Sequence, residues 1–167
     1  MQTIIKILAD GAVVPVVLLA GYALLFKVPA KGRYQAYARI IMAGLTAYLF
    51  AKLLGSAYQP SGERPFEILG VAPGASYLNN PGFPSDHALF TTFLTLAVWY
   101  ETHQKKIAIT LVLLTLLVCI GRVLALVHTP LDVIGGILVA SLGALWYIQV
   151  PKTRMRRHRS HGKKLIQ

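Results

Sequence analysis

Five long apolar stretches alternate with shorter polar ones along the chain, and this pattern is the main structural signal in the sequence. The stretches cover residues 11–26, 36–54, 87–100, 107–127 and 131–150. A helix needs about 20 mostly apolar residues to cross the hydrocarbon core of a bilayer. The third stretch is short at 14 residues, so we expect its helix to extend into the polar residues that follow. The pattern predicts an all-α, polytopic membrane helix bundle with about five transmembrane helices.

The first ten residues, MQTIIKILAD, form a separate short segment. Their apolar run is too short for a signal peptide, and no small-residue cleavage site follows it. Ile4, Ile5 and Leu8 share one face at helical spacing. We therefore expect a short N-terminal helix that lies in the membrane interface.

The composition supports lipid as the solvent of most of the chain. Hydrophobic residues make up 55% of the 167 residues and charged residues 14%, whereas soluble domains carry about 25% charge. This excludes a disordered chain and a soluble Rossmann-type enzyme. The single cysteine, Cys119, excludes an intrachain disulfide framework and a zinc site made of thiolates. The length allows one bundle, so we expect residues 1–150 to form a single membrane-embedded domain.

The formal net charge of +11 has a topological explanation. If the loops 27–35 and 101–106 and the tail 151–167 are cytoplasmic, that side holds 13 of the 17 lysines and arginines, as the positive-inside rule requires. The basic cytoplasmic tail suits anionic lipid headgroups. The apolar stretches leave little chain for a basic face in water, so we expect no nucleic acid partner. The bilayer itself is the expected partner, and the sequence carries no signal of oligomeric state.

The segment 55–86 is the one long polar stretch, and it lies on the outer side in this topology. It is dense in Gly, Pro, Ser and Asn, as in QPSGERP and NNPGFPS, which disfavours a long helix and favours a structured loop. Loops of this length in small domains are usually functional. We therefore expect this loop to carry part of a catalytic site.

Ionisable residues gather at the outer ends of the predicted helices. Charge at membrane depth is costly, so such residues normally pair or line a polar cavity. The group comprises Lys52, Arg64, Asp86, His87, Arg122, His128 and Asp132. Three cations and two histidines at one end predict an anion site, and phosphate suits arginine because guanidinium donors match its oxygens. The same cations argue against a metal site, and no cofactor is expected.

Two short segments in this group have the order of residues that phosphoryl chemistry needs. Ser85 or Asp86 can cap the helix that follows, leaving backbone N–H groups for an anion, and His87 in its first turn can donate a proton to a leaving oxygen. Pro130 suits the first position of the last helix. Asp132 then falls in the first turn, where its carboxylate can orient His128 for attack on phosphorus.

The motifs Arg64-Pro65, Pro84-Ser85-Asp86-His87 and Gly121-Arg122-x5-His128-x3-Asp132 resemble the three-part signature of the type 2 phosphatidic acid phosphatase superfamily. Its usual form is Lys-x6-Arg-Pro, Pro-Ser-Gly-His and Ser-Arg-x5-His-x3-Asp. The resemblance covers about residues 50–140. It implies that His128 is a nucleophile that forms a phosphohistidine, with Asp132 as its partner and His87 as the acid. It also implies that phosphate is held by a set comprising Arg64, Arg122 and Ser85.

Three positions depart from the family pattern. Lys52 precedes Arg64 by 12 residues, and the usual lysine position, seven before the arginine, is Ala57. Gly121 replaces a serine and removes a hydroxyl donor, and Asp86 replaces a glycine. The Phe-Pro-Ser-Asp-His form of the second motif is similar to the undecaprenyl-diphosphate phosphatase branch.

Simpler structural roles stay open for several of these residues. Arg64 can be a surface arginine of the loop, and Lys52 can extend its side chain to the interface. Ser85 and Asp86 can serve simply as helix caps, with no contact to phosphate. Gly135, Gly136 and Gly143 can permit close helix contacts without touching substrate. Cys119 lies within an apolar stretch and is expected to pack inertly.

The sequence thus predicts a metal-independent lipid phosphatase in the inner membrane with its active site on the extracytoplasmic side. The expected substrate is undecaprenyl diphosphate, which would be converted to undecaprenyl phosphate. Phosphatidylglycerophosphate and phosphatidate are the alternative substrates. A lipid-phosphate-binding protein without enzymatic activity is the alternative of another class, and it would tolerate loss of His128.

Overall fold

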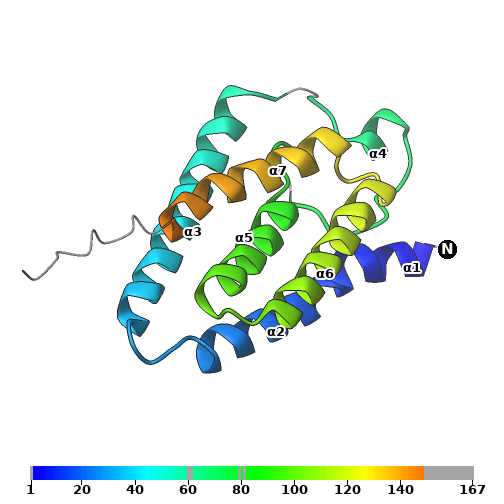
Figure 1. Ribbon diagram of the computed structural model, residues 1–167. Coiled ribbons are helices and arrows are strands. Elements are labelled where there is room, and N and C mark those ends of the chain that lie inside the picture. Colours follow the sequence, from blue (N-terminus) through cyan, green and yellow to red (C-terminus); the bar gives the residue numbers. More distant parts are fainter. Residues whose placement is uncertain (1, 60–61, 79, 81, 149–167) are drawn as a thin grey trace, which may run out of the picture.

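The protein is built from helices joined by short turns and one long loop (Figure 1). The computed structural model describes residues 2–59, 62–78, 80 and 82–148, and within these ranges there is no β-strand. The elements are α1 Gln2–Lys6, η1 Ile7–Gly11, α2 Val13–Phe26, α3 Arg33–Ala57, α4 Pro65–Ile68, α5 Asp86–Glu101, α6 Lys105–Leu124, α7 Pro130–Gly143 and η2 Ala144–Tyr147. The predicted all-α class is confirmed, and the tail 151–167 lies outside the described residues.

Four helical stretches are long and apolar enough to cross a membrane. They are Gln2–Phe26, Arg33–Ala57, Lys105–Leu124 and Pro130–Tyr147. Their outward faces expose large apolar side chains such as Leu18, Leu49 and Leu113, which in water would form an unusually large apolar patch. The chain is therefore a membrane protein with a helical bundle fold.

The third predicted span, 87–100, corresponds to α5, which lies at the centre of the bundle (Figure 1) and has 16 residues. Its neighbours α2, α3, α6 and α7 cover it, so it can carry buried threonines where a lipid-facing helix would carry leucine. Thr95 donates to the main-chain carbonyl of Thr91, and its Oγ1 lies 3.0 Å from Oγ1 of Thr115 on α6. These hydrogen bonds satisfy hydroxyl groups that would otherwise be costly to bury.

Glycines let α7 approach its neighbours closely, as the sequence predicts. A Cβ atom at Gly136 would lie 2.6 Å from the Ser85 carbonyl oxygen, and one at Gly143 would lie 2.5 Å from the Ala43 carbonyl oxygen. A Cβ at Gly135 would overlap the Phe83 ring. Because these positions carry no side chain, α7 packs closely against α3 and against the start of α5.

We expect Gly136→Ala to lower the free energy of unfolding by about 1–3 kcal/mol, because the new methyl group must displace the main chain at Ser85. Thermal unfolding in detergent measures this change. Gly21→Ala is the matched control, since a Cβ at Gly21 meets no atom within 4 Å and alanine favours a helix over glycine. Equal melting temperatures for the two variants would contradict the close contact.

Two ion pairs mark the opposite ends of the bundle. At one end, Arg39 of α3 donates two hydrogen bonds of 2.6 and 2.7 Å to the carboxylate of Glu101 at the end of α5. At the other end, Arg122 near the end of α6 pairs with Asp10. The loops 27–32 and 102–104 belong to the Arg39 end. The long loop and the turn between α6 and α7 belong to the Arg122 end.

Two predicted helix ends are wrong, and the N-terminal segment differs from the expected interfacial helix. The third helix ends at Glu101 and does not extend into the polar stretch, because His103 adopts a left-handed conformation with φ of 56°. The fourth ends at Leu124, close to Leu126, whose φ is 59°. The expected N-terminal helix is present as α1, but the π-helical turn η1 joins it to α2. The buried Ala9 in that turn packs against α6, so this part of the segment is covered by protein.

Candidate active site

His128 and Asp132 face each other where α7 begins. Thr129 is the N-cap of α7, and Pro130 occupies its first turn as predicted. The Asp132 carboxylate accepts a hydrogen bond of 2.7 Å from the Thr129 N–H, and the Asp132 N–H donates to the Thr129 hydroxyl. This capping box fixes the carboxylate, whose Oδ2 lies 3.6 Å from Nδ1 of the buried His128. This separation is longer than a hydrogen bond, and Nδ1 has no hydrogen-bond partner among the described residues. The fixed carboxylate therefore faces Nδ1, and Nε2 is the other ring nitrogen, left for chemistry.

Ser85 precedes α5 and is fully buried. Its N–H donates to the Asp132 carbonyl oxygen over 2.9 Å, which ties the second motif to the third. Although it occupies the N-cap position, its side chain makes no capping hydrogen bond. The Oγ atom is buried and has no hydrogen-bond partner among the described residues. A plain capping role therefore does not explain this hydroxyl.

Arg64 is a buried residue, and its interpretation as a surface arginine is wrong. Its Nη1 donates to the carbonyl oxygen of Val127, next to His128, over 2.6 Å. Its Nη2 donates over 3.0 Å to the carbonyl oxygens of Leu78 and Asn80 and to the Asn80 side chain. The long loop is thus folded around this guanidinium, which brings the first motif beside the third.

Arg122 is the largest fully buried side chain of the described residues, with 1% exposure. Its Nη1 donates to the Asp10 carboxylate over 2.9 Å and to the Ser76 carbonyl oxygen over 2.8 Å. Its Nε is buried without a hydrogen-bond partner in the described part of the chain. A buried guanidinium with an unused donor is suited to bind an anion.

These residues surround one small cavity. Its volume is about 20 Å³, and its lining comprises Arg64, Leu78, Asn80, Pro84, Asp86, His87, Arg122 and His128. Ser85 and Asp132 lie directly behind it through the contacts described above. The structure therefore brings together seven of the eight residues that the sequence singled out, all except Lys52. The space holds about one water molecule, so a phosphate group must displace some of the present contacts.

Lys52 lies outside this group, contrary to expectation. It lines a neighbouring pocket of about 220 Å³ with Gly55, Ser56 and Phe83, and its ammonium group lies 5.3 Å from the centre of the Tyr48 ring. The reason is its position on α3, which fixes the direction of its side chain, whereas Arg64 belongs to the loop. The five additional residues between Lys52 and Arg64, relative to the family pattern, do not place the lysine side chain at the cavity.

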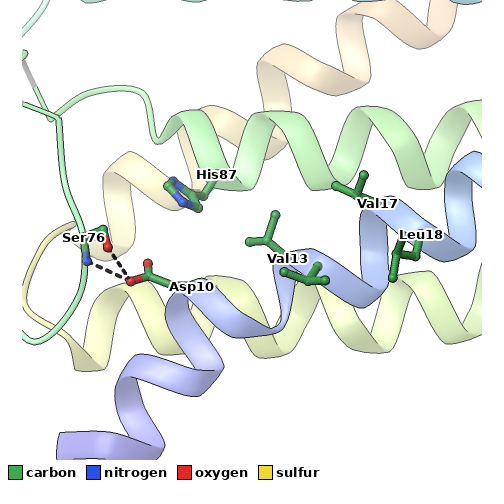
Figure 2. A pocket seen from close by; sticks show the side chains of 7 residues that line it. Asp10, Val13, Val17, Leu18, Ser76 and His87 are labelled. Carbon is green, nitrogen blue, oxygen red and sulfur yellow. Dashed lines mark hydrogen bonds between the residues drawn. The ribbon is translucent and has the colours of Figure 1, made fainter.

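The cavity adjoins a larger apolar groove. Figure 2 shows His87 at one end of this groove with Asp10 and Ser76 across from it, and Val13 and Val17 of α2 along its side. Val14 and Leu18 complete the lining, and the groove volume is about 400 Å³. The polar cavity and the apolar groove thus meet at His87.

His128 is held in its neutral form. Burial lowers the pKa of its imidazole below the ordinary value of 6.5, and the nearby Arg122 and Arg64 lower it further, while the Asp132 carboxylate raises it. A neutral imidazole has the free electron pair that a nucleophile needs. The environment of His128 therefore favours the reactive form at neutral pH.

We expect the acidic limb of the kcat/KM profile to lie below pH 6.5, because activity requires neutral His128 and its pKa is depressed. Activity should fall below this limb as His128 becomes protonated. A pH series of initial rates in detergent tests this. A limb centred above pH 6.5 would contradict the depressed pKa.

A model of the PAP2 superfamily matches residues 33–156 of the chain. The chain belongs to the PAP2 superfamily. Members of this superfamily are phosphatases that act on phosphate esters, often of lipids, and the chain is accordingly a phosphatase of the hydrolase class. The search of curated proteins and the search of solved structures each found no match.

The PAP2 motifs account for most of the cavity, but the sequence did not reveal three residues around it. Asp10 and Ser76 bind Arg122, and Asn80 binds Arg64. Asp10 is the one acid in the N-terminal apolar region, and Gly121 departs from the family pattern. Taken together, these two signals could have suggested that the N-terminal segment reaches the site. Within the described residues, no three His, Cys, Asp or Glu side chains form a group able to hold a metal.

Proposed function

We propose that this PAP2 superfamily member is an integral membrane lipid phosphatase that works through a phosphohistidine at His128. One observation carries the proposal. The His128 imidazole lies 3.6 Å from the Asp132 carboxylate, on a cavity that it shares with two buried arginines and a second histidine. A nucleophile, an acid and donors for phosphate oxygens are the parts that such a transfer needs.

In the first step, Nε2 of His128 attacks phosphorus and the bond from phosphorus to the leaving oxygen breaks. The negative charge of the bound phosphate favours the protonated ring of His87. His87 gives this proton to the leaving oxygen, while Asp132 stabilises the positive charge that develops on the His128 ring. Arg122, Arg64 and Ser85 donate to the phosphoryl oxygens, where negative charge is concentrated. Asp86 lies on the rim of the cavity.

In the second step, a water molecule attacks the phosphohistidine. His87, now neutral, takes a proton from the water as its oxygen bonds to phosphorus. The bond between phosphorus and Nε2 breaks, and inorganic phosphate and neutral His128 are restored. Protons and charges balance within this group of side chains, so the proposed cycle calls for no metal and no cofactor.

The apolar groove beside His87 supports a lipid as the leaving group. Its valines and leucine belong to α2, whose outer face exposes further apolar side chains. A lipid chain in the bilayer can therefore extend along α2 while its phosphate reaches the cavity. We propose undecaprenyl diphosphate as the substrate because of the Phe83-Pro-Ser-Asp-His87 sequence. Phosphatidylglycerophosphate and phosphatidate are the substrates to compare with it.

The proposed location is the inner membrane with the cavity on the extracytoplasmic side. The loop 27–32, which carries Lys27 and Lys31, and the lysine pair 105–106 at the start of α6 lie at the opposite end of the bundle from the cavity, beside Arg39 and Glu101. The positive-inside rule assigns that end to the cytoplasm. The proposed domain spans residues 1–150, with the tail 151–167 on the cytoplasmic side.

Phosphate release from the three lipids, measured side by side on purified protein with EDTA present, tests this function. We expect release from at least one lipid, fastest from undecaprenyl diphosphate, with no effect of the chelator. Binding of the lipids without release would favour a non-enzymatic lipid-binding protein. Loss of activity in EDTA would contradict the metal-independent mechanism.

A further inference from the structure

The N-terminal segment reaches the candidate active site through Asp10. One carboxylate oxygen, Oδ1, accepts a hydrogen bond of 2.9 Å from Nη1 of Arg122. The other, Oδ2, accepts hydrogen bonds of 2.9 and 2.8 Å from the N–H and the hydroxyl of Ser76 in the long loop. Figure 2 shows the hydrogen bonds between Asp10 and Ser76 at the polar end of the groove, across from His87. A single carboxylate therefore joins three separate parts of the chain at Arg122.

This approach depends on Gly121, which precedes Arg122 on α6. A Cβ atom there would lie 2.6 Å from the Ala9 nitrogen, 2.7 Å from the Leu8 carbonyl carbon and 2.8 Å from the Ala9 Cα. All three are main-chain atoms of the N-terminal segment, so no side-chain rotation could relieve the overlap. The turn η1 places these atoms against α6, and π-helical turns of this kind often occur at functional sites. The serine that is usual in the family would not fit here.

Asp10 fixes one side of the Arg122 guanidinium and leaves another donor unused. Nη1 is occupied by Asp10 and by the Ser76 carbonyl oxygen, whereas Nε is buried without a partner among the described residues. Both oxygens of Asp10 are already bound to protein, so this carboxylate does not need to touch the substrate. Its negative charge also offsets part of the cost of burying Arg122 without phosphate.

From these contacts we infer that Asp10 is a positioning residue for phosphoryl transfer. It holds Arg122 in the orientation that presents its free donor to the phosphate, and Gly121 is the structural condition for this contact. The inference rests on the proposed function and adds to it a residue outside the three family motifs. Arg122 in turn contributes mainly in the transition state, where charge on the phosphoryl oxygens is redistributed.

Asp10→Asn tests the inference. The amide keeps the size of the side chain but removes the charge that orients Arg122. We expect kcat to fall by about 10- to 100-fold, as is typical when a supporting group outside direct contact is lost, with KM changed less than about 3-fold. Glu63→Gln is the charge-matched control, since it also neutralises an acid and Glu63 is exposed in the long loop that contains Ser76. This variant should retain wild-type kcat.

A double-mutant cycle shows whether Asp10 acts through Arg122. In an Arg122→Lys background, Asp10→Asn should lower kcat by less than about 2-fold, because the group that it positions is gone. An unchanged kcat in Asp10→Asn alone would overturn the inference while leaving the phosphatase mechanism intact. A full, independent loss in the double mutant would overturn it too. Absence of phosphate release by the wild-type protein would overturn the proposed function, and this inference with it.

Gly121→Ser provides a second test. The family pattern alone would lead one to expect that serine is tolerated at this position, and we expect the opposite. It restores the usual serine, yet we expect kcat to fall by about 10-fold or more, because the side chain displaces Leu8 and Ala9 and withdraws Asp10 from Arg122. Gly21→Ser is the matched control on α2, where a Cβ has open space. Wild-type or higher activity of Gly121→Ser would contradict the role of the N-terminal segment.

Discussion

Replacing His128 with Asn is expected to lower the rate of phosphate release by at least about 10⁴-fold, because the residue that bonds to phosphorus is lost. The protein should remain folded, since Asn is smaller and polar and the capping box of α7 involves Thr129 and Asp132. Initial rates with the best lipid substrate, at matched detergent and protein concentrations, measure the effect.

His103→Asn is the matched control for this substitution. His103 is exposed and lies at the opposite end of the bundle, near Arg39 and Glu101. Its left-handed backbone conformation is one that asparagine adopts readily. The control should keep wild-type activity. Substantial turnover in His128→Asn would remove the covalent mechanism and leave the cavity as a binding site for phosphate.

Asp132→Asn is expected to lower kcat by about 10³- to 10⁴-fold, because an amide cannot stabilise the positive charge on the His128 ring or hold the same tautomer. The amide oxygen can still accept the hydrogen bond from the Thr129 N–H, so α7 should keep its N-terminus. Glu63→Gln again serves as the control for a neutralised acid.

The same variant should change the pH profile of the residual activity. The Asp132 carboxylate raises the pKa of His128 against the larger effect of burial. Its removal therefore lowers that pKa further, and the acidic limb of kcat/KM should move to lower pH. A limb that moves to higher pH, or a kcat within about 10-fold of wild type, would contradict the proposed pairing of Asp132 with His128.

Sequence alone predicted the bundle and most of the cavity for one physical reason. In an antiparallel helical bundle, alternate helix ends meet on the same side, so polar residues at the ends of apolar stretches converge. Ser85 and His87 precede or begin one helix, Arg122 nears the end of the next, and Asp132 begins the last. The spacing of Thr129, Pro130 and Asp132 also specified the start of α7 by capping chemistry that acts locally.

Other features depended on packing that periodicity does not encode. The direction of Lys52 follows from the rotation of α3 about its axis, which is set by contacts with α5 and α7. The burial of Arg64 follows from the fold of the long loop, whose carbonyl oxygens surround the guanidinium. Asp10 reaches Arg122 across 112 positions of sequence, through a close contact that exists only because Gly121 has no side chain.

Trapping of the covalent intermediate tests the phosphohistidine most directly. The wild-type protein is mixed with a lipid diphosphate labelled in its terminal phosphate, quenched in alkali within one turnover and digested for mass spectrometry. We expect a label that is stable in alkali and labile in acid, on a peptide containing His128, and absent from His128→Asn. Turnover without any labelled protein, or a label on His87 with none on His128, would show that phosphate takes a different route.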